Sequence, residues 1–365
     1  MGGALRELET LIKSSISKDG IYVVRALSAL LVVFLHVTSL LIPQQVWIEK
    51  SGPLYLIAPW LFRGEVGVGV FIFLSGFLLS LNIPNGIKEW KGFFIRRFSR
   101  IYPVYLFVLI FAISITRQWE FNGFINAIFL FPNFPGTLWP SPYLSTAWSL
   151  GIEWTLYFLF PLLLFSIASR RFNYVLIIVF CELIILYGHF MGTDFHTLVY
   201  GSIIGRLIEF VLGMVLALNF SWIRGLSKSV FLPLVALALV IFHFWCLWYL
   251  LANGSISESY WRLFQPLAES LFAASLILIS QLNYSGLFKI ISKPFVFIGV
   301  ISYPLYMTHM IVLDAIKNSF EREINIAIQI VFIFGLSLLL AWVVHELIEK
   351  PGMKLGRNNS HQRNV

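Results

Sequence analysis

About ten long apolar stretches, separated by short polar segments, are the feature that most limits what this sequence can fold into. A helix needs roughly 20 mostly apolar residues to cross the hydrocarbon core of a bilayer. The stretches lie near residues 21–42, 65–82, 101–116, 146–168, 173–190, 203–219, 230–250, 264–281, 294–314 and 325–346. We therefore expect an all-α, polytopic integral membrane protein with about ten transmembrane helices.

The composition agrees with this class. Of the 365 residues, 58% are hydrophobic and 12% are charged, and this balance excludes an ordinary water-soluble domain. The first apolar stretch is too long for a signal-peptide core and lacks a small-residue cleavage site after it, so we interpret it as a retained span. We divide the chain into a short cytoplasmic segment (1–20), a transmembrane domain (21–347) and a cytoplasmic polar tail (348–365).

The distribution of lysine and arginine predicts the orientation. With the N-terminus in the cytoplasm, eighteen of the 26 basic residues fall in inside segments and six in outside segments, as the positive-inside rule requires. Both termini are therefore expected in the cytoplasm. The net charge of +8 needs no nucleic acid to explain it, and the partner that this composition demands is the lipid bilayer. The long outer segments 43–64 and 117–145 suggest a folded or re-entrant cap, and the oligomeric state is left open.

Five ionisable side chains from four predicted spans fall in the outer half of the membrane. They are His36, Glu153, Arg206, Glu209 and His309. An ionisable group at the centre of a span costs about 2.5 to 3.5 kcal/mol on insertion scales, so each one is a functional hypothesis by default.

Arginines occupy the opposite layer. Arg25 and His36 are eleven residues apart, close to three full helical turns, so they share one face about 16 Å apart along the axis. Arg97 and Arg100 are spaced i, i+3, and a helix presents them together. The sequence thus predicts guanidinium groups below and an imidazole above, facing one cavity.

Acyl transfer across a membrane is the chemistry that suits such a cavity. Guanidinium groups bind phosphates bidentately, as an acyl-CoA entering from the cytoplasm requires. A neutral imidazole can deprotonate an alcohol as it attacks a thioester. Arg25 then holds the donor while His36 activates the acceptor. Glu153 or Glu209 is expected to orient the imidazole, and Arg206 or a tyrosine to receive the oxyanion.

Seven short motifs occur in order along the chain. They are Arg25 with His36; Ser75, Gly76 and Phe77; Arg97, Arg100, Ile101, Tyr102 and Pro103; Trp148, Ser149, Leu150, Glu153 and Tyr157; Arg206, Glu209, Phe210 and Gly213; Ser302, Tyr303, Tyr306 and His309; and Glu349, Lys350 and Pro351. At these residues the chain resembles acyltransferase family 3, the integral membrane O-acyltransferases of bacterial surface and secreted glycans.

The resemblance implies a function and a location. It implies a multi-pass protein of the bacterial cytoplasmic (inner) membrane, an acyl-CoA donor, which we expect to be acetyl-CoA, and a glycan or lipid-linked oligosaccharide acceptor at the outer face, without a metal. His36 is the implied catalytic base. Among the residues that match, donor binding is assigned to Arg25, Arg97 and Arg100, and acceptor-side or supporting roles to Ser75, Trp148, Tyr157 and His309.

The chain departs from the family pattern in three places. Many members carry an acidic residue where this chain has Gly69, so a polar partner near the second span is missing or replaced. The usual opening motif is loosened to KDGIYVVRA, which weakens any role for Asp19. Many relatives also append an extracytoplasmic hydrolase-like domain, whereas this sequence stops at Val365, so we expect the membrane domain to complete the transfer or to pass the acyl group to another protein.

Structural interpretations stand beside the functional ones. His36 can be a hydrogen-bonding contact between helices, and His309 an interfacial histidine. Glu153 belongs either to the site or to a buried pair with Arg206, and Arg206 can equally pair with Glu209 at i, i+3.

The remaining candidates also have plainer explanations. Arg97 and Arg100 can serve only as a positive-inside anchor, and Ser75 can simply allow close packing beside Gly76.

A transporter, or an exporter of acyl groups without acceptor chemistry of its own, is the alternative function. Polar groups at two depths can line a substrate path. The sequence disfavours this alternative because it shows neither repeated halves nor paired broken helices, which transporters usually have.

Overall fold

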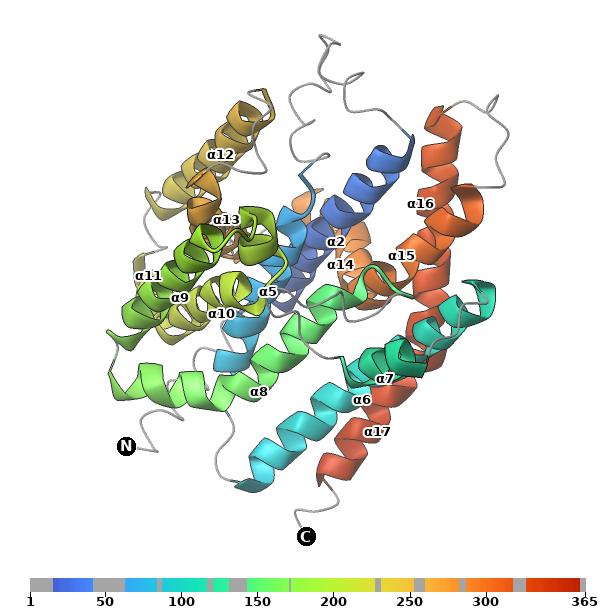
Figure 1. The fold of residues 1–365 in the computed structure, drawn as a ribbon, viewed down its shortest axis with the longest axis horizontal. Coiled ribbons are helices and arrows are strands. Elements are labelled where there is room, and N and C mark those ends of the chain that lie inside the picture. Colours follow the sequence, from blue (N-terminus) through green and yellow to red (C-terminus); the bar gives the residue numbers. More distant parts are fainter. Residues whose placement is uncertain are drawn as a thin grey trace.

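The structure is a computed structural model that describes residues 16–41, 63–83, 87–116, 121–130, 143–170, 172–226, 231–252, 260–281, 287–317 and 326–361. Every regular element in these ranges is a helix (Figure 1), so the all-α prediction is confirmed. Most of the expected segment 1–20 and nearly all of 43–64 lie outside the described residues. Within 117–145 the structure places a short helix, α7 (Phe121–Phe129).

The helices are those of a multi-pass membrane protein. In the described ranges, six are long and apolar enough to cross a bilayer. They are α2 (Lys18–Leu41), α6 (Ile87–Thr116), α8 (Ala147–Ser169), α9 (Asn173–Phe190), α13 (Gln265–Ser280) with the turn before it, and α16 (Ile326–Val344), which continues through η3 (His345–Glu349) into α17 (Lys350–His361). The helices α5 (Val66–Ser80), α10 (Ile203–Leu218) and α12 (Phe231–Ala252) account for three further expected spans. Of these, α5 and the apolar part of α12 are shorter than a full span, and the number ten stays a prediction.

The span expected over 294–314 is not one straight helix. It consists of α14 (Leu287–Val300) and α15 (Ser302–Lys317), which meet at a bend of 70°. Pro304 explains why the first helix cannot continue, because its nitrogen carries no hydrogen to donate to the carbonyl four residues earlier. The bend directs α15 back along α2, and this places His309 in the interior of the bundle.

Helix α5 lies at the centre of the bundle and packs against α2, α10 and α13 (Figure 1). Its contact with α10 is reciprocal. Gly76 of α5 lies against the carbonyl of Phe210, and Gly213 of α10 lies against the carbonyl of Phe73. Glycines allow two helix backbones to approach this closely in a membrane, where association depends on van der Waals packing.

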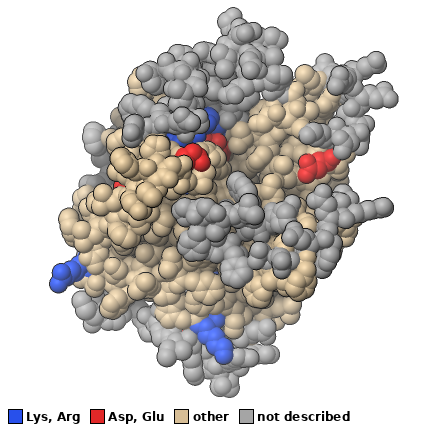
Figure 2. All heavy atoms as spheres, in the orientation of Figure 1, with Lys and Arg blue, Asp and Glu red and all other residues tan. Residues whose placement is uncertain are grey.

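The outer surface of the bundle is largely apolar. Figure 2 shows one face on which the described residues include few charged side chains. Helix α9 is the clearest case, since Phe180, Leu183 and Tyr187 are all more than half exposed and only Cys181 and Ile185 are buried. Such a surface matches the hydrocarbon of a bilayer, where backbone polar groups are satisfied inside each helix.

The segment expected as a polar tail is helical as far as His361. Helix α17 packs along α6, and Gly352 lies against the carbonyl of Ser99. Between α16 and α17 the chain widens into one turn of π-helix, η3. A π-turn of this kind is frequently found at functional sites, and here it places Glu349, fully buried, beside Arg100.

The glycine contact between α5 and α10 yields a test of the fold. Gly213→Ala inserts a methyl group where the Phe73 backbone leaves no room, and overpacking of this kind costs about 1 to 3 kcal/mol. We expect a lower midpoint of thermal unfolding for the protein in detergent. Gly335→Ala is the matched control, because apart from its neighbours in the chain and the backbone of its own helix no described atom lies within 4 Å of its added carbon. Equal midpoints for the two variants would contradict the packing described here.

Candidate functional site

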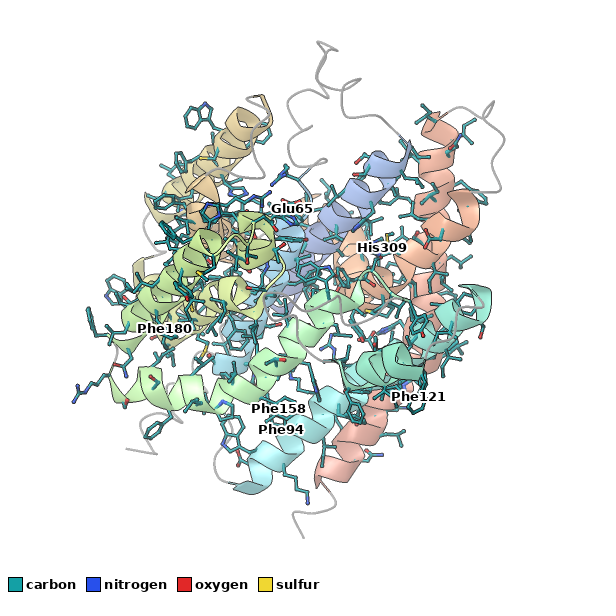
Figure 3. All side chains as sticks on the ribbon, viewed as in Figure 1. Glu65, Phe94, Phe121, Phe158, Phe180 and His309 are labelled. Carbon is teal, nitrogen blue, oxygen red and sulfur yellow. The ribbon has the colours of Figure 1, made fainter. Side chains whose placement is uncertain are left out.

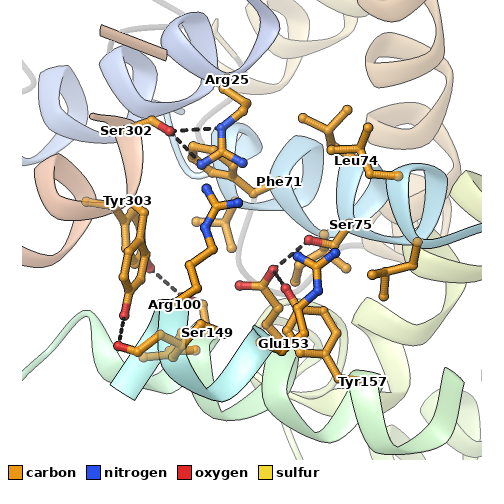
Figure 4. A pocket seen from close by; sticks show the side chains of 18 of the residues that line it. Arg25, Phe71, Leu74, Ser75, Arg100, Ser149, Glu153, Tyr157, Ser302 and Tyr303 are labelled. Carbon is orange, nitrogen blue, oxygen red and sulfur yellow. Dashed lines mark hydrogen bonds between the residues drawn. The ribbon is translucent and has the colours of Figure 1, made fainter. Parts of the chain in front are cut away.

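A cavity of about 270 Å³ lies between α2, α5, α6, α8 and α15. Four charged side chains line it, namely Arg25, Arg97, Arg100 and Glu153. Figure 4 shows the guanidinium groups of Arg25 and Arg100 facing each other and Glu153 turned toward Ser75 and Tyr157. Three positive charges against one negative charge make the cavity suited to an anion. The arginines predicted to lie together in one layer do so.

Arg25 joins α2 to the bend between α14 and α15. Its guanidinium donates hydrogen bonds to Ser302 Oγ at 2.9 and 3.1 Å and to the carbonyl of Gly299 at 3.3 Å. That carbonyl also accepts from Ser302 Oγ at 2.9 Å. The break between α14 and α15 therefore leaves the Gly299 carbonyl and the Ser302 hydroxyl available as acceptors, and Arg25 donates to both. Arg25 thus stabilises the bend and also lines the cavity.

Arg97 and Arg100 are held in different ways. Arg97 lies over the rings of Phe93 and Tyr157, at 5.7 and 5.4 Å from their centroids. Arg100 Nε lies 3.5 Å from Glu349 Oε1. In the described part of the chain Arg97 makes neither an ion pair within 4 Å nor a hydrogen bond to protein, so its donors are available to a ligand in the cavity.

Glu153 lies with the arginines and not in the outer layer. It accepts a hydrogen bond from Ser75 Oγ at 2.6 Å and a short one from the Tyr157 hydroxyl. The expected pair with Arg206 is not formed. Glu153 is therefore not the neighbour of His36 that the residue count suggested, because α8 begins inside the protein, where Thr146 O accepts from the Tyr306 hydroxyl at 3.3 Å.

Tyr306 lies at the end of the cavity that is nearer to His309. Its hydroxyl shares a hydrogen bond of 2.6 Å with Ser149 Oγ, and its ring lies edge-on to Phe71 with centroids 6.3 Å apart. All three residues line the cavity. The ring of His309 lies on the far side, 6.0 Å from that of Tyr306.

His309, which is labelled in Figure 3, lies on α15 and forms a pair with His36 of α2 on the far side of Tyr306. His309 Nε2 and His36 Nδ1 are 3.2 Å apart, and the ring centroids are 5.0 Å apart. His309 is fully buried. Among the described residues that line the cavity, neither histidine is present, so the single cavity expected for Arg25 and His36 is divided by Tyr306.

Arg206 and Glu209 form a second buried polar cluster, together with Glu269 of α13. Arg206 Nη1 contacts Glu209 Oε1 at 2.5 Å and Glu269 Oε2 at 3.1 Å, and all three side chains are about 1% exposed. Arg206 Nε donates to the carbonyl of Tyr200 at 3.0 Å, and its guanidinium lies over the Tyr200 ring. The ring of Trp148 packs on that same tyrosine, 4.8 Å away. The i, i+3 pair is thus present and is extended by a second carboxylate.

Neither carboxylate expected to orient His36 hydrogen-bonds to it. Glu153 is held by Ser75 and Tyr157, and Glu209 is held by Arg206. Neither carboxylate is free to turn toward His36, because each is already hydrogen-bonded to other side chains. Within the described ranges, the side chain that hydrogen-bonds to His36 is that of His309.

Glu269 is the residue that sequence reasoning missed. The sequence does contain a sign of its importance, because Glu269 is an acidic residue within the predicted span 264–281. A side chain at Gly69 would meet the carboxylates of Glu269 and Glu209, so the carboxylate of Glu269 occupies the space above this glycine. The polar partner that the second span itself lacks is supplied by α13.

His189 and Asp194 lie close together in the sequence but do not form part of a metal site. His189 stacks on Phe195, and Asp194 caps the following turn through Thr197. In the part of the chain that the structure describes, no three histidine, cysteine or acidic side chains are placed to hold one metal ion.

The sequence is similar to those of known acyltransferases. A sequence model described as an acyltransferase domain matches residues 18–346. The O-acetyltransferase OatA of Staphylococcus aureus strain NCTC 8325 / PS 47 is 27% identical over 334 residues, which cover 83% of this chain and 55% of that protein. The putative O-acetyltransferase SACOL0978 of S. aureus strain COL is 25% identical over 336 residues, with the same coverage. The chain spans about half the length of these curated relatives. No solved structure matches it.

The space above Gly69 leads to a double-mutant prediction. Gly69→Asp places a third carboxylate against Glu209 and Glu269, and we expect it to lower the unfolding free energy by about 2 kcal/mol or more because a buried charge is left unpaired. Glu269→Ala removes a partner of Arg206 and should destabilise as well. The double variant should recover most of the loss, since the carboxylate introduced on α5 then takes the place of the one removed from α13.

Thermal unfolding of the four proteins in the same detergent measures this coupling. A double variant that is less stable than both single variants would refute the exchange of one carboxylate for the other.

Proposed function

The chain belongs to acyltransferase family 3, whose model matches residues 18–346, and from this premise we propose that it transfers an acetyl group from acetyl-CoA to a hydroxyl of a glycan. The acceptor is lipid-linked or exported and is met at the outer face of the bacterial cytoplasmic membrane. One observation carries the proposal: three arginines converge on a cavity, and a paired histidine stands further along the helix that supplies the first of them. The names of the relatives support the acetyl group and the oxygen acceptor.

Donor binding is assigned to the arginine side of the cavity. Arg97 and Arg100 present guanidinium groups that match the phosphates of acyl-CoA, and Arg25 adds a third. The cavity volume of about 270 Å³ is just below the usual range of about 300 to 1,000 Å³ for ligand pockets. It suits the pantetheine arm, with the nucleotide at the cytoplasmic mouth.

The chemistry is assigned to His36. Its Nε2 takes the proton of the acceptor hydroxyl while the oxygen attacks the thioester carbon. The tetrahedral intermediate then expels the CoA thiolate, which receives that proton, so that the products are an ester and free CoA. For the thioester to reach His36, the Tyr306 ring must turn aside from Ser149, and its released hydroxyl then becomes a donor for the oxyanion.

The orientation follows from the positive-inside rule. We propose that the ends of α6 and α17 that carry Lys91, Arg96 and Lys354 face the cytoplasm, together with the arginine side of the cavity. His36 then lies toward the outer face. Ten spans with both termini in the cytoplasm is the topology that fits this arrangement.

Replacing the base tests the reaction. His36→Asn keeps much of the side-chain volume and removes the proton acceptor, so we expect the alkali-labile acetate on the glycans of expressing cells to fall by at least about 100-fold. The measurement uses a host without O-acetyl esters of its own, and membrane insertion is checked by immunoblot. Acetate above about a tenth of the wild-type amount would remove His36 from this role.

The same variant separates the enzyme from an exporter. Inverted vesicles that contain each protein are given acetyl-CoA labelled in the acetyl group. Label that reaches glycan only with His36 in place supports the enzyme, whereas label that enters the lumen unattached, with His36→Asn as with the wild type, supports the exporter.

Removing one cavity arginine tests donor binding. Arg97→Gln should raise the KM for acetyl-CoA about tenfold or more, because a charge-assisted contact to a phosphate is lost. Arg96→Gln is the matched control, since it removes the same charge from an exposed position on the same helix that does not line the cavity. An equal KM in both variants would assign Arg97 to the structure alone.

A further inference from the structure

We propose that His309 positions His36 for catalysis by accepting a hydrogen bond from His36 Nδ1. The proposal rests on the proposed function, in which His36 is the base, and it identifies the residue that holds that base in place. It replaces the carboxylates expected from the sequence. The contact that carries it is the 3.2 Å separation between His36 Nδ1 and His309 Nε2, both in the interior between α2 and α15.

Backbone carbonyls determine which ring nitrogens carry hydrogen. His36 Nδ1 lies 2.9 Å from the carbonyl of Val32, and His309 Nδ1 lies 3.1 Å from the carbonyl of Leu305. A carbonyl oxygen only accepts, so each Nδ1 must be the donor. A neutral imidazole has one N–H, and Nε2 of each ring is therefore an acceptor.

The shared contact has one consistent direction. His309 Nε2 carries a lone pair and faces the N–H at His36 Nδ1, so His36 donates and His309 accepts. The His36 N–H is shared between this nitrogen and the carbonyl of Val32. Two acceptors on one N–H fix both the tautomer and the rotation of the ring. The opposite nitrogen, His36 Nε2, keeps its lone pair, and no described residue hydrogen-bonds to it.

This arrangement assists proton uptake at the right atom. When His36 Nε2 takes the hydroxyl proton, positive charge spreads over the ring and the N–H at Nδ1 becomes a stronger donor. The hydrogen bond to His309 then strengthens as the transition state is approached, which is the condition for a catalytic contribution. His309 stays neutral and gains no proton, and the proton on Nε2 passes to the departing thiolate.

The position of His309 is secured independently of His36. Its ring is fully buried, it is bound to its own helix through Leu305 O, and it packs against Tyr306. Seven residues earlier on the same helix, Ser302 accepts from Arg25. Helices α2 and α15 are thus joined at two levels, and a buried ring held by these contacts is a suitable support for a base.

Two substitutions at His309 test the role. His309→Phe keeps an aromatic ring and removes the acceptor, whereas His309→Gln restores an acceptor oxygen near the position of Nε2. Purified full-length proteins in lipid nanodiscs are assayed for acetyl-CoA affinity, and the acetate on glycans of expressing cells reports turnover. We expect His309→Phe to lower the acetate about 10- to 100-fold with acetyl-CoA affinity unchanged within about twofold. His309→Gln should recover at least about a tenth of the wild-type acetate and exceed the Phe variant.

His243→Phe is the matched control. His243 is also a buried histidine, it stacks on Phe272, and neither of its ring nitrogens has a hydrogen-bond partner among the described residues. We expect wild-type acetate from this variant. Wild-type acetate from His309→Phe, a Gln variant no better than the Phe variant, or weakened donor affinity in both His309 variants would each overturn the proposal.

Failure of the proposal is distinguishable from failure of the proposed function. If His36→Asn is inactive and His309→Phe is fully active, His36 keeps its role and His309 loses the one inferred here. A readout independent of activity is the nitrogen NMR spectrum of protein labelled at its histidines. A scalar coupling between His36 Nδ1 and His309 Nε2 is expected, and its absence in folded wild-type protein would argue against the hydrogen bond.

Discussion

The absence of water inside a bilayer is the constraint on which this structure depends. An arginine and a histidine on one membrane helix must find partners within the protein, and α2 finds both on the same neighbour. Arg25 hydrogen-bonds to Ser302 and to the carbonyl of Gly299 that the helix break leaves available. About three turns further along α2, His36 meets His309, which lies about two turns beyond Ser302 on α15. The bend of 70° between α14 and α15 brings these partners to α2. The same bend therefore shapes the site and supplies the hydrogen-bond partners of Arg25 and His36.

The bundle contains two buried groups of polar side chains, one suited to holding helices together and the other suited to binding a ligand. Around Arg206 a single guanidinium is surrounded by Glu209, Glu269 and a backbone carbonyl, with almost no exposed surface. In the cavity the balance is reversed, since arginines outnumber carboxylates and Arg97 rests on aromatic rings. In the first grouping the positive charge is paired with acids of the protein itself, and it joins α10 to α13. The second retains positive charge, as a site for a polyanionic donor must.

Much of the architecture was accessible from the sequence because lipid restricts the choices. Apolar stretches separated by polar segments predicted helices at nearly the observed positions, and the eleven-residue spacing on α2 correctly put Arg25 and His36 on the side that faces α15. Glu153 was expected near His36 and lies instead with the arginines, because counting residues from a span boundary assumes that the helix starts at the membrane surface. Helix α8 starts beside Tyr306 instead. Glu269 was overlooked although it is an acid within a predicted span, because its partner Arg206 on α10 and the space above Gly69 on α5 belong to other helices.

The sequence by itself determined that this chain is helical, that it lies in a membrane, and which ionisable residues had to be sheltered there, because hydrophobic length and the cost of burying charge act residue by residue. Tertiary structure alone decided the partners. Whether His36 faces a carboxylate or another imidazole, and whether Arg206 meets one acid or two, depends on where a second helix crosses the first. That crossing is set by features distant in sequence, a proline-induced break at 301 to 304 and glycines that allow α5 to touch α10. A pattern within one helix does not show which residues of another helix will lie beside it.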